Sequence, residues 1–153
     1  MEIRREDETL KISQTKMIEK VLEKFGMDNC KGAQTPMEQE TSLTKEEIID
    51  DVPYRELIGC LIYIATVSRP DITYAISYLS RYLDKPTRTM WTAAKRVLRY
   101  LKITSNKCLT YTKSLEKLLL CYTDADWASD KENRKSVSDC CIFHNGNLVS
   151  WFT

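Results

Sequence analysis

Four cations recur on one side of a predicted helix, and they are the side chains of this sequence best suited to contacting phosphate. They are Lys95, Arg96, Arg99 and Lys102. Clustered cations suffice for such contacts, because binding a phosphate backbone requires no base-specific geometry. The alternative interpretation is an ordinary solvated helix face, which most charge runs are. Taken alone, the cluster favours the solvated face.

The cysteines and the single histidine form no comparable pattern. The cysteines include no Cys-x-x-Cys pair and are Cys30, Cys60, Cys108, Cys121, Cys140 and Cys141. We expect reduced thiols that pack as small hydrophobes, and no zinc site. His144 lies in a predicted hairpin turn, so we expect a solvent-exposed residue and no Cys–His or Ser–His nucleophile.

Length and charge exclude several classes of protein. The chain has 153 residues, which correspond to one ordinary domain or to two small pieces of larger ones. The net charge of +1 argues against a strongly basic nucleic-acid binder, so such binding would require local clustering of cations. No run approaches the roughly 18 apolar residues of a membrane span, and no apolar signal core follows Met1. We therefore expect an intracellular protein, cytoplasmic or nuclear, that is not secreted and has no membrane partner.

Apolar periodicity predicts helices in the first two thirds of the chain. The predicted segments are Gln14 to Phe25, Tyr54 to Ala65, a helix that restarts at Pro70, and Met90 to Lys102. Pro70 suits a first helical position, and Asp71 behind it complements the helix N-terminus. Trp91 belongs to the apolar stripe of the last helix. The polar stretch from Cys30 to Val52 predicts an extended connector.

The remainder of the chain predicts strands. Leu10 to Ser13 has the character of a short strand end, and three further β-prone runs follow the helices. These runs are Leu118 to Tyr122, Asp139 to Phe143 and Leu148 to Phe152. Asn145-Gly146 between the last two predicts a tight hairpin, because the favoured turn needs positive φ at both central residues. The expected fold class is α+β.

Several runs, taken in order, resemble the Pol polyprotein of copia-type retrotransposons. The reverse transcriptase part is represented by Ser13-Gln14, Ile18 to Met27, Thr35 to Met37, Pro53 to Tyr63, Ser68 to Ile72, Leu79 to Arg81 and Lys95 to Lys102. The opening of the ribonuclease H domain is represented by Tyr122 to Ala128 and Arg134 to Ser136. The resemblance implies two domains. Residues 1–104 would be the thumb- and connection-like C-terminal segment of the reverse transcriptase, and residues 105–153 the N-terminal part of a truncated ribonuclease H-like antiparallel sheet.

The resemblance also bears on catalysis. In the family, polymerisation depends on a Tyr-x-Asp-Asp strand that would precede Met1; Asp50-Asp51 lies in the connector and is interpreted as a solvated pair. For ribonuclease H, the resemblance makes Asp124 a metal ligand at the end of the first strand. The partner ligands, a Glu on the next helix and further Asp residues, would follow Thr153. A two-ion mechanism needs several carboxylates, so one aspartate predicts no complete site.

Other residues near Asp124 do not complete that site on our interpretation. Asp126 and Asp139 are interpreted as solvent-facing or turn carboxylates, and Trp127 as a core residue rather than a stacking platform. Val137 to Cys141 departs from the Thr-Ser-Gly-Tyr pattern usual in the family, which indicates relaxed constraint.

The predicted function is therefore a fragment of a copia-type Pol polyprotein without complete polymerase and nuclease active sites. The parent family is an RNA-directed DNA polymerase and ribonuclease H that uses Mg²⁺. This chain alone is expected to be inactive and to hold no Mg²⁺ tightly. One alternative is a non-catalytic module that binds an RNA–DNA hybrid or other nucleic acid through the four cations. Once the resemblance is taken into account, phosphate contact and an ordinary solvated face are equally favoured for these cations. Another is a protein-interaction piece that associates with further polyprotein segments or with itself.

Overall fold

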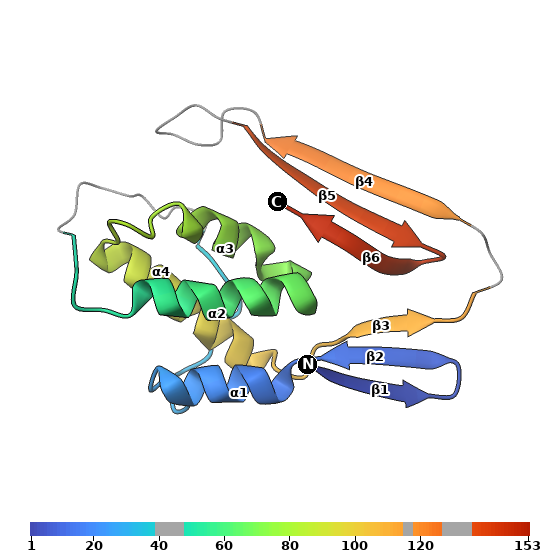
Figure 1. Ribbon diagram of the computed structural model, residues 1–153, viewed down its shortest axis with the longest axis horizontal. Coiled ribbons are helices and arrows are strands. Elements are labelled where there is room, and N and C mark those ends of the chain that lie inside the picture. The colour runs from blue at the N-terminus through green and yellow to red at the C-terminus, as the bar shows by residue number, and fades with distance from the viewer. Residues whose placement is uncertain (39–47, 115–117, 127–135) are drawn as a thin grey trace. The chain divides into compact units, whose positions relative to one another are not determined.

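The computed structural model describes residues 1–38, 48–114, 118–126 and 136–153 (Figure 1). The chain divides into two units, which are described separately. The helical unit comprises Met1–Glu2 and Ser13–Cys108, and the strand unit comprises Ile3–Ile12 and Leu109–Thr153. The structure thus groups an N-terminal segment with the last third of the chain. The division at residue 104 taken from the resemblance stays a prediction.

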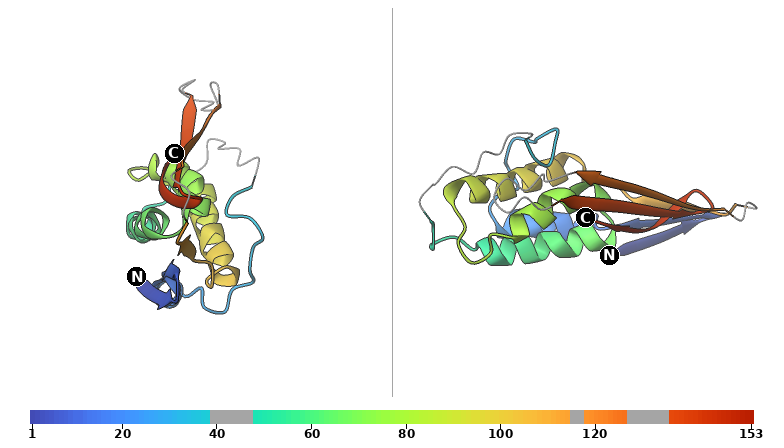
Figure 2. Two further views of the ribbon diagram at one scale, coloured as in Figure 1. Left: turned by 90° about the vertical axis from the view of Figure 1, so that its right-hand side faces the viewer. Right: turned by 90° about the horizontal axis from the view of Figure 1, so that it is seen from above.

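The helical unit contains every helix that the apolar periodicity predicts. Its elements are α1 (Thr15–Lys24), α2 (Tyr54–Val67), the 3₁₀ turn η1 (Pro70–Ile72), α3 (Thr73–Ser80) and α4 (Arg88–Ile103). Pro70 occupies the first position of η1, as expected from its fixed φ and missing N–H. The helices pack side by side, as the two views of Figure 2 show.

One apolar core holds the four helices together. α2 is its centre, and the side chains of Leu57, Ile58, Leu61 and Ile64 are completely buried, as the sequence predicts for this helix. Its partners are Ile18, Val21 and Leu22 of α1, Ile76 and Leu79 of α3, and Ala94, Val97, Leu98 and Leu101 of α4. The hydroxyl of Tyr54 donates to the carbonyl of Leu79 at 2.9 Å, which joins the start of α2 to the end of α3.

The strand unit consists of two three-stranded sheets. The first has the order β1-β2-β3, and the second the order β4-β5-β6. The strands are β1 (Glu2–Glu6), β2 (Thr9–Ser13), β3 (Leu109–Thr112), β4 (Leu119–Asp126), β5 (Val137–His144) and β6 (Asn147–Phe152). The predicted strand end at Leu10 and the three predicted C-terminal strands are confirmed. β4, β5 and β6 form an antiparallel meander, and the fold is α+β.

The turn between β5 and β6 has the geometry that its sequence predicts. Asn145 and Gly146 adopt φ values of 53° and 77°, the left-handed region that glycine and asparagine tolerate best. Asn145 also forms hydrogen bonds with Leu118, the residue that precedes β4. Its N–H donates to the carbonyl of Leu118 at 2.8 Å, and its side-chain oxygen accepts from the amide of Leu118 at 2.9 Å. The turn therefore fixes the start of β4 as well.

Candidate functional site

The predicted basic face lies on α4, opposite the buried stripe of that helix. Met90, Ala94 and Leu98 and their neighbours face the core, so the residues between them project outward. Thr87 caps the helix, and its hydroxyl accepts from the amide of Met90. The structure therefore brings all four predicted cations onto one helix, as the periodicity requires.

A non-helical segment, residues 30–38, lies along this basic face and uses part of it. The side chain of Arg99 donates from Nε to the carbonyl of Lys31 at 2.7 Å, and Lys102 donates to the carbonyl of Cys30 at 2.7 Å. An extended segment makes no helical hydrogen bonds of its own, so its carbonyls need other donors. These two cations therefore serve packing within the helical unit.

Arg96 continues the same attachment. It forms an ion pair with Glu38 and donates to the hydroxyl of Thr35 at 3.1 Å. Gly32 permits the close approach of the segment, because a Cβ at this position would lie 2.1 Å from Cγ2 of Ile103. The sequence showed the cations, but it gave no sign that the connector would cover them.

Two hollows remain along α4. One of about 370 Å³ is lined by Glu38, Arg88, Thr89, Thr92, Ala93, Arg96 and Arg99. Within the described residues, Arg88 and the terminal nitrogens of Arg99 have no hydrogen-bonding or ionic partner. Arg88 was missed in the sequence analysis although its spacing from Arg96 and Arg99, eight and eleven residues, places it on the same helix face.

The second hollow, of about 620 Å³, contains Lys95 and Trp91 and is bordered by residues 48–52. The ammonium group of Lys95 lies 5.5 Å from the centre of the Trp91 ring, a cation–π distance. Trp91 is half-buried against the core, as predicted. Asp50 and Asp51 are exposed here, in agreement with their interpretation as a solvated pair.

Asp124, the predicted metal ligand, lies within β4 and is exposed. Its Oδ1 accepts from the amide of Ala125 at 2.9 Å. In the ladder it stands directly opposite Asp139 of β5, and like charges in that position repel. Asp139 is half-buried within a strand, which differs from the turn or solvent-facing carboxylate that we expected. The side chain of Asp126 and the whole of Trp127 lie outside the described residues.

The described carboxylates do not fit a two-ion centre. Such a centre needs several carboxylates around two ions roughly 4 Å apart. In the part of the chain that the structure describes, no group of three or more His, Cys, Asp or Glu residues could hold a metal ion. Among the described side chains, Asp124 and Asp139 stand opposite each other and belong to no larger cluster of potential ligands.

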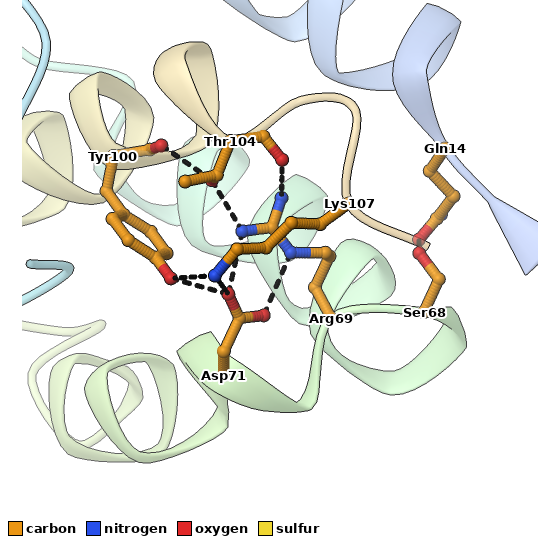
Figure 3. A network of polar contacts seen from close by, with 7 residues as sticks. All are labelled: Gln14, Ser68, Arg69, Asp71, Tyr100, Thr104 and Lys107. Carbon is orange, nitrogen blue, oxygen red and sulfur yellow. Dashed lines mark hydrogen bonds and ion pairs between the residues drawn. The ribbon is translucent and has the colours of Figure 1, made fainter. Parts of the chain in front are cut away.

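A polar network that no local sequence pattern indicates lies at the Ser68 to Asp71 motif (Figure 3). The guanidinium of Arg69 is almost completely buried and binds the carboxylate of Asp71 through two hydrogen bonds of 2.8 Å. It also donates to the backbone carbonyl and the hydroxyl of Thr104, at 3.0 and 2.7 Å. The network thus joins the α2–α3 junction to the residue that follows α4.

Asp71 is the centre of this network. Tyr100 donates to it at 2.7 Å, and Lys107 donates to Tyr100 at 3.1 Å. Burial by itself would raise the pKa of Asp71, but the hydrogen bonds from Arg69 and Tyr100 outweigh it and lower this pKa below the ordinary value. The motif suggested only a break and a new helix start, because the distant partners are not visible in a local pattern.

The cysteines and the histidine differ in part from expectation. All six cysteines are free, and Cys140 is buried as predicted, but Cys108 and Cys121 are exposed, so the prediction of burial is wrong for these two. The sulfur atoms of Cys121 and Cys140 lie 3.4 Å apart. His144 is exposed at the end of β5, next to the hairpin turn. Among the described helices, none is long and apolar enough to cross a membrane.

No protein-family model and no solved structure matches the chain. Curated proteins do match. The chain is 38% identical over 149 residues to the retrovirus-related Pol polyprotein from transposon TNT 1-94 of Nicotiana tabacum, an alignment that covers 92% of this chain and 11% of that protein. It is 34% identical over 154 residues to the corresponding polyprotein from transposon RE2 of Arabidopsis thaliana, with 99% and 10% covered.

A third relative is smaller. The chain is 43% identical over 101 residues to secreted RxLR effector protein 161 of Plasmopara viticola, with 66% of this chain and 71% of that protein aligned. The two polyprotein matches cover 92% and 99% of the chain, and they define its class. Within that class the chain belongs to the copia-type Pol polyproteins. It spans about a tenth of the length of the polyproteins that it matches.

Proposed function

We propose that this chain is the part of a copia-type Pol polyprotein in which the last helices of the reverse transcriptase are followed by the first strands of the ribonuclease H domain. We propose further that its own residues form no complete polymerase or nuclease site. The lack of a nuclease site is supported by the surroundings of Asp124, which stands opposite one carboxylate, Asp139. Among the side chains that the structure describes, no group of three or more His, Cys, Asp or Glu residues could hold a metal ion.

The helical unit supports a structural role for the first part. Its buried cation, Arg69, is engaged in packing, because it binds Asp71 and the end of α4. A group that performs chemistry must be able to reach a substrate, and Arg69 has 1% of its side chain exposed. We infer that the motif around Arg69 maintains the arrangement of α2, α3 and α4.

A hybrid-cleavage assay tests the proposed lack of nuclease activity. The purified chain is incubated with Mg²⁺ and a labelled RNA–DNA hybrid, beside Asp124→Asn and the control Asp50→Asn, which removes an exposed carboxylate of the other unit. We expect no cutting that depends on Asp124. Cutting that Asp124→Asn abolishes and Asp50→Asn preserves would overturn the proposal.

A second candidate function is contact with the phosphate backbone of a nucleic acid, and a specific observation favours it. The outward face of α4 carries Arg88, Lys95 and the terminal nitrogens of Arg99 beside two hollows. Guanidinium and ammonium groups without a hydrogen-bonding or ionic partner keep their donors available for phosphate oxygens. Arg96 and Lys102, which were also predicted to bind nucleic acid, contact Glu38 and the carbonyl of Cys30.

A salt titration tests this second function. Each phosphate neutralised by a cation steepens the fall of affinity with salt by about one unit on a double-logarithmic plot. We expect Arg88→Gln/Lys95→Gln to flatten the slope for an RNA–DNA hybrid by roughly two units relative to the parent chain. The charge-matched control Lys16→Gln/Lys20→Gln removes exposed cations of α1 and should leave the slope unchanged. Equal salt slopes for the two double variants would exclude phosphate contact through α4.

The strand unit favours protein association as an additional property. The side chains of Leu119, Tyr122 and Phe152 are 68%, 62% and 56% exposed, which is high for large apolar residues. We propose that further polyprotein segments, or a second copy of the chain, cover them. Size-exclusion chromatography over a range of concentrations tests whether the isolated chain self-associates.

A further inference from the structure

Two cysteines on adjacent strands of the strand unit are in direct contact. Cys121 of β4 stands opposite Ile142, and Cys140 of β5 stands opposite Thr123, so the two cysteines are diagonal neighbours. Residues directly opposite each other share a face of the sheet, and alternate residues of a strand return to that face. Cys121 and Cys140 therefore share one face, and their sulfur atoms lie 3.4 Å apart.

The two thiols differ in access to solvent. Cys121 is exposed, whereas Cys140 has 7% of its surface exposed. The hydrogen bond with Cys121, reinforced by burial, raises the pKa of the Cys140 thiol. The thiolate is the nucleophile in disulfide chemistry, so an accessible thiol reacts first and a protonated, buried one reacts second. Cys121 has the position of the attacking thiol and Cys140 that of the resolving thiol.

We infer that Cys121 and Cys140 form a site of thiol–disulfide exchange that reacts with small disulfides of the glutathione class and closes into an intrachain disulfide. Cys121 loses its proton to solvent, attacks one sulfur of oxidised glutathione and releases one glutathione thiolate. Cys140 then loses its proton to solvent, attacks the Cys121 sulfur of the mixed disulfide and releases the second glutathione. The two cysteines lose two electrons, and oxidised glutathione gains them as it becomes two reduced molecules.

The strand arrangement allows the closure. A disulfide requires sulfur atoms about 2.05 Å apart, so the two sulfurs must approach by somewhat more than 1 Å. β4 is an edge strand of its sheet and pairs with β5 alone among the described strands, so it can shift toward β5 without breaking a second ladder. The bond would enclose residues 122–139 and fix β4 to β5 independently of hydrogen bonding.

Mass spectrometry of the full chain tests this site directly. The chain is equilibrated with oxidised and reduced glutathione, alkylated and digested with trypsin, which separates residues 118–131 from residues 136–153. The expected product links these two peptides. Cys141→Ser is the matched control, since Cys141 neighbours Cys140 but points to the opposite face, and it should retain the link in full.

The single variants distinguish the two roles. Cys140→Ser should accumulate the mixed disulfide of Cys121 with glutathione, and Cys121→Ser should lose the intrachain link completely. The parent chain needs no variant to give a decisive result, so a folding defect of Cys140→Ser would leave the test intact. A parent chain that acquires glutathione on Cys121 without the link, or a link that Cys141→Ser removes, would overturn the inference. The result of this mass-spectrometric test does not depend on nuclease activity or on nucleic-acid binding.

Discussion

Replacing Asp71 by asparagine should destabilise the helical unit strongly, because it leaves a buried cation without its counter-ion. The side chain of Arg69 is 1% exposed, and in Asp71→Asn its contacts among the described residues would all be with neutral groups: the asparagine, the two oxygens of Thr104 and the ring of Tyr100. Breaking a buried pair by removing one partner costs about 3–5 kcal/mol. Asp71 is 29% exposed and asparagine still accepts a hydrogen bond, so we expect the lower end, about 3 kcal/mol. This is a large part of the 5–15 kcal/mol typical of a domain.

A double-mutant cycle separates the ion pair from other effects of the substitution. Arg69→Met preserves much of the side-chain volume but removes four hydrogen bonds, and we expect it to cost about 2–3 kcal/mol. The double variant no longer contains an unpaired charge, so its cost should fall short of the sum by about 2 kcal/mol. The exposed pair Arg55–Asp84, with side chains 72% and 89% exposed, is the matched control. Its variants Arg55→Met and Asp84→Asn should each change stability by less than about 0.5 kcal/mol.

Urea unfolding followed by circular dichroism at a helix-sensitive wavelength measures these differences, because every described helix lies in the helical unit. The denaturant slope should stay constant across the variants, which shows that the same transition is compared. An effect of Asp71→Asn below about 1 kcal/mol, or strict additivity in the cycle, would refute the energetic coupling of the buried Arg69 to Asp71.

Three further predictions follow from individual positions. The pKa of Asp71 is lowered in the folded chain. The stability that its carboxylate contributes is therefore complete above the unfolded carboxyl pKa of about 3.9, and it disappears as pH falls through the folded pKa. In urea melts below about pH 4, the free energy of unfolding should fall more steeply with pH for the parent chain than for Asp71→Asn. Gly32→Ala should cost about 1–2 kcal/mol because its Cβ meets Ile103, whereas Gly59→Ala, with open space around it in α2, should gain about 0.5–1 kcal/mol in the same melts. The isolated chain should elute from a sizing column earlier as its concentration rises, and a monomer at every concentration would contradict association through the strand unit.

The elements of the fold were predictable where local sequence determines them. The helix around Leu57 and the hairpin at Asn145-Gly146 follow from a 3.6-residue apolar period and from positive-φ requirements, both of which are local. β1 and β3 were missed for a different reason. β1 is the charged run Glu2–Glu6, without apolar alternation, and β3 pairs with β2 about a hundred residues away in sequence, so only the folded chain reveals the pairing.

The same limit applies to the candidate site. The position of Asp124 on a strand followed from the apolar run before it, but its neighbour Asp139 depends on the register of β4 against β5. A shift of one residue would place a different side chain opposite, and no local pattern fixes that register. The partners of Arg69 were hidden in the same way, since Thr104 lies 35 residues along the chain.

The basic face of α4 shows why the number of cations in a sequence overestimates the number available to a ligand. Lys95, Arg96, Arg99 and Lys102 were equivalent in sequence, yet residues 30–38 bring carbonyls and a carboxylate that need donors, and the nearest cations supply them. The same arrangement leaves Arg88 without a partner among the described residues. A phosphate surface on this helix would therefore depend on Arg88, Lys95 and part of Arg99. Removing Lys102 should loosen the connector and affect stability more than nucleic-acid affinity, which urea melts and the salt titration can separate.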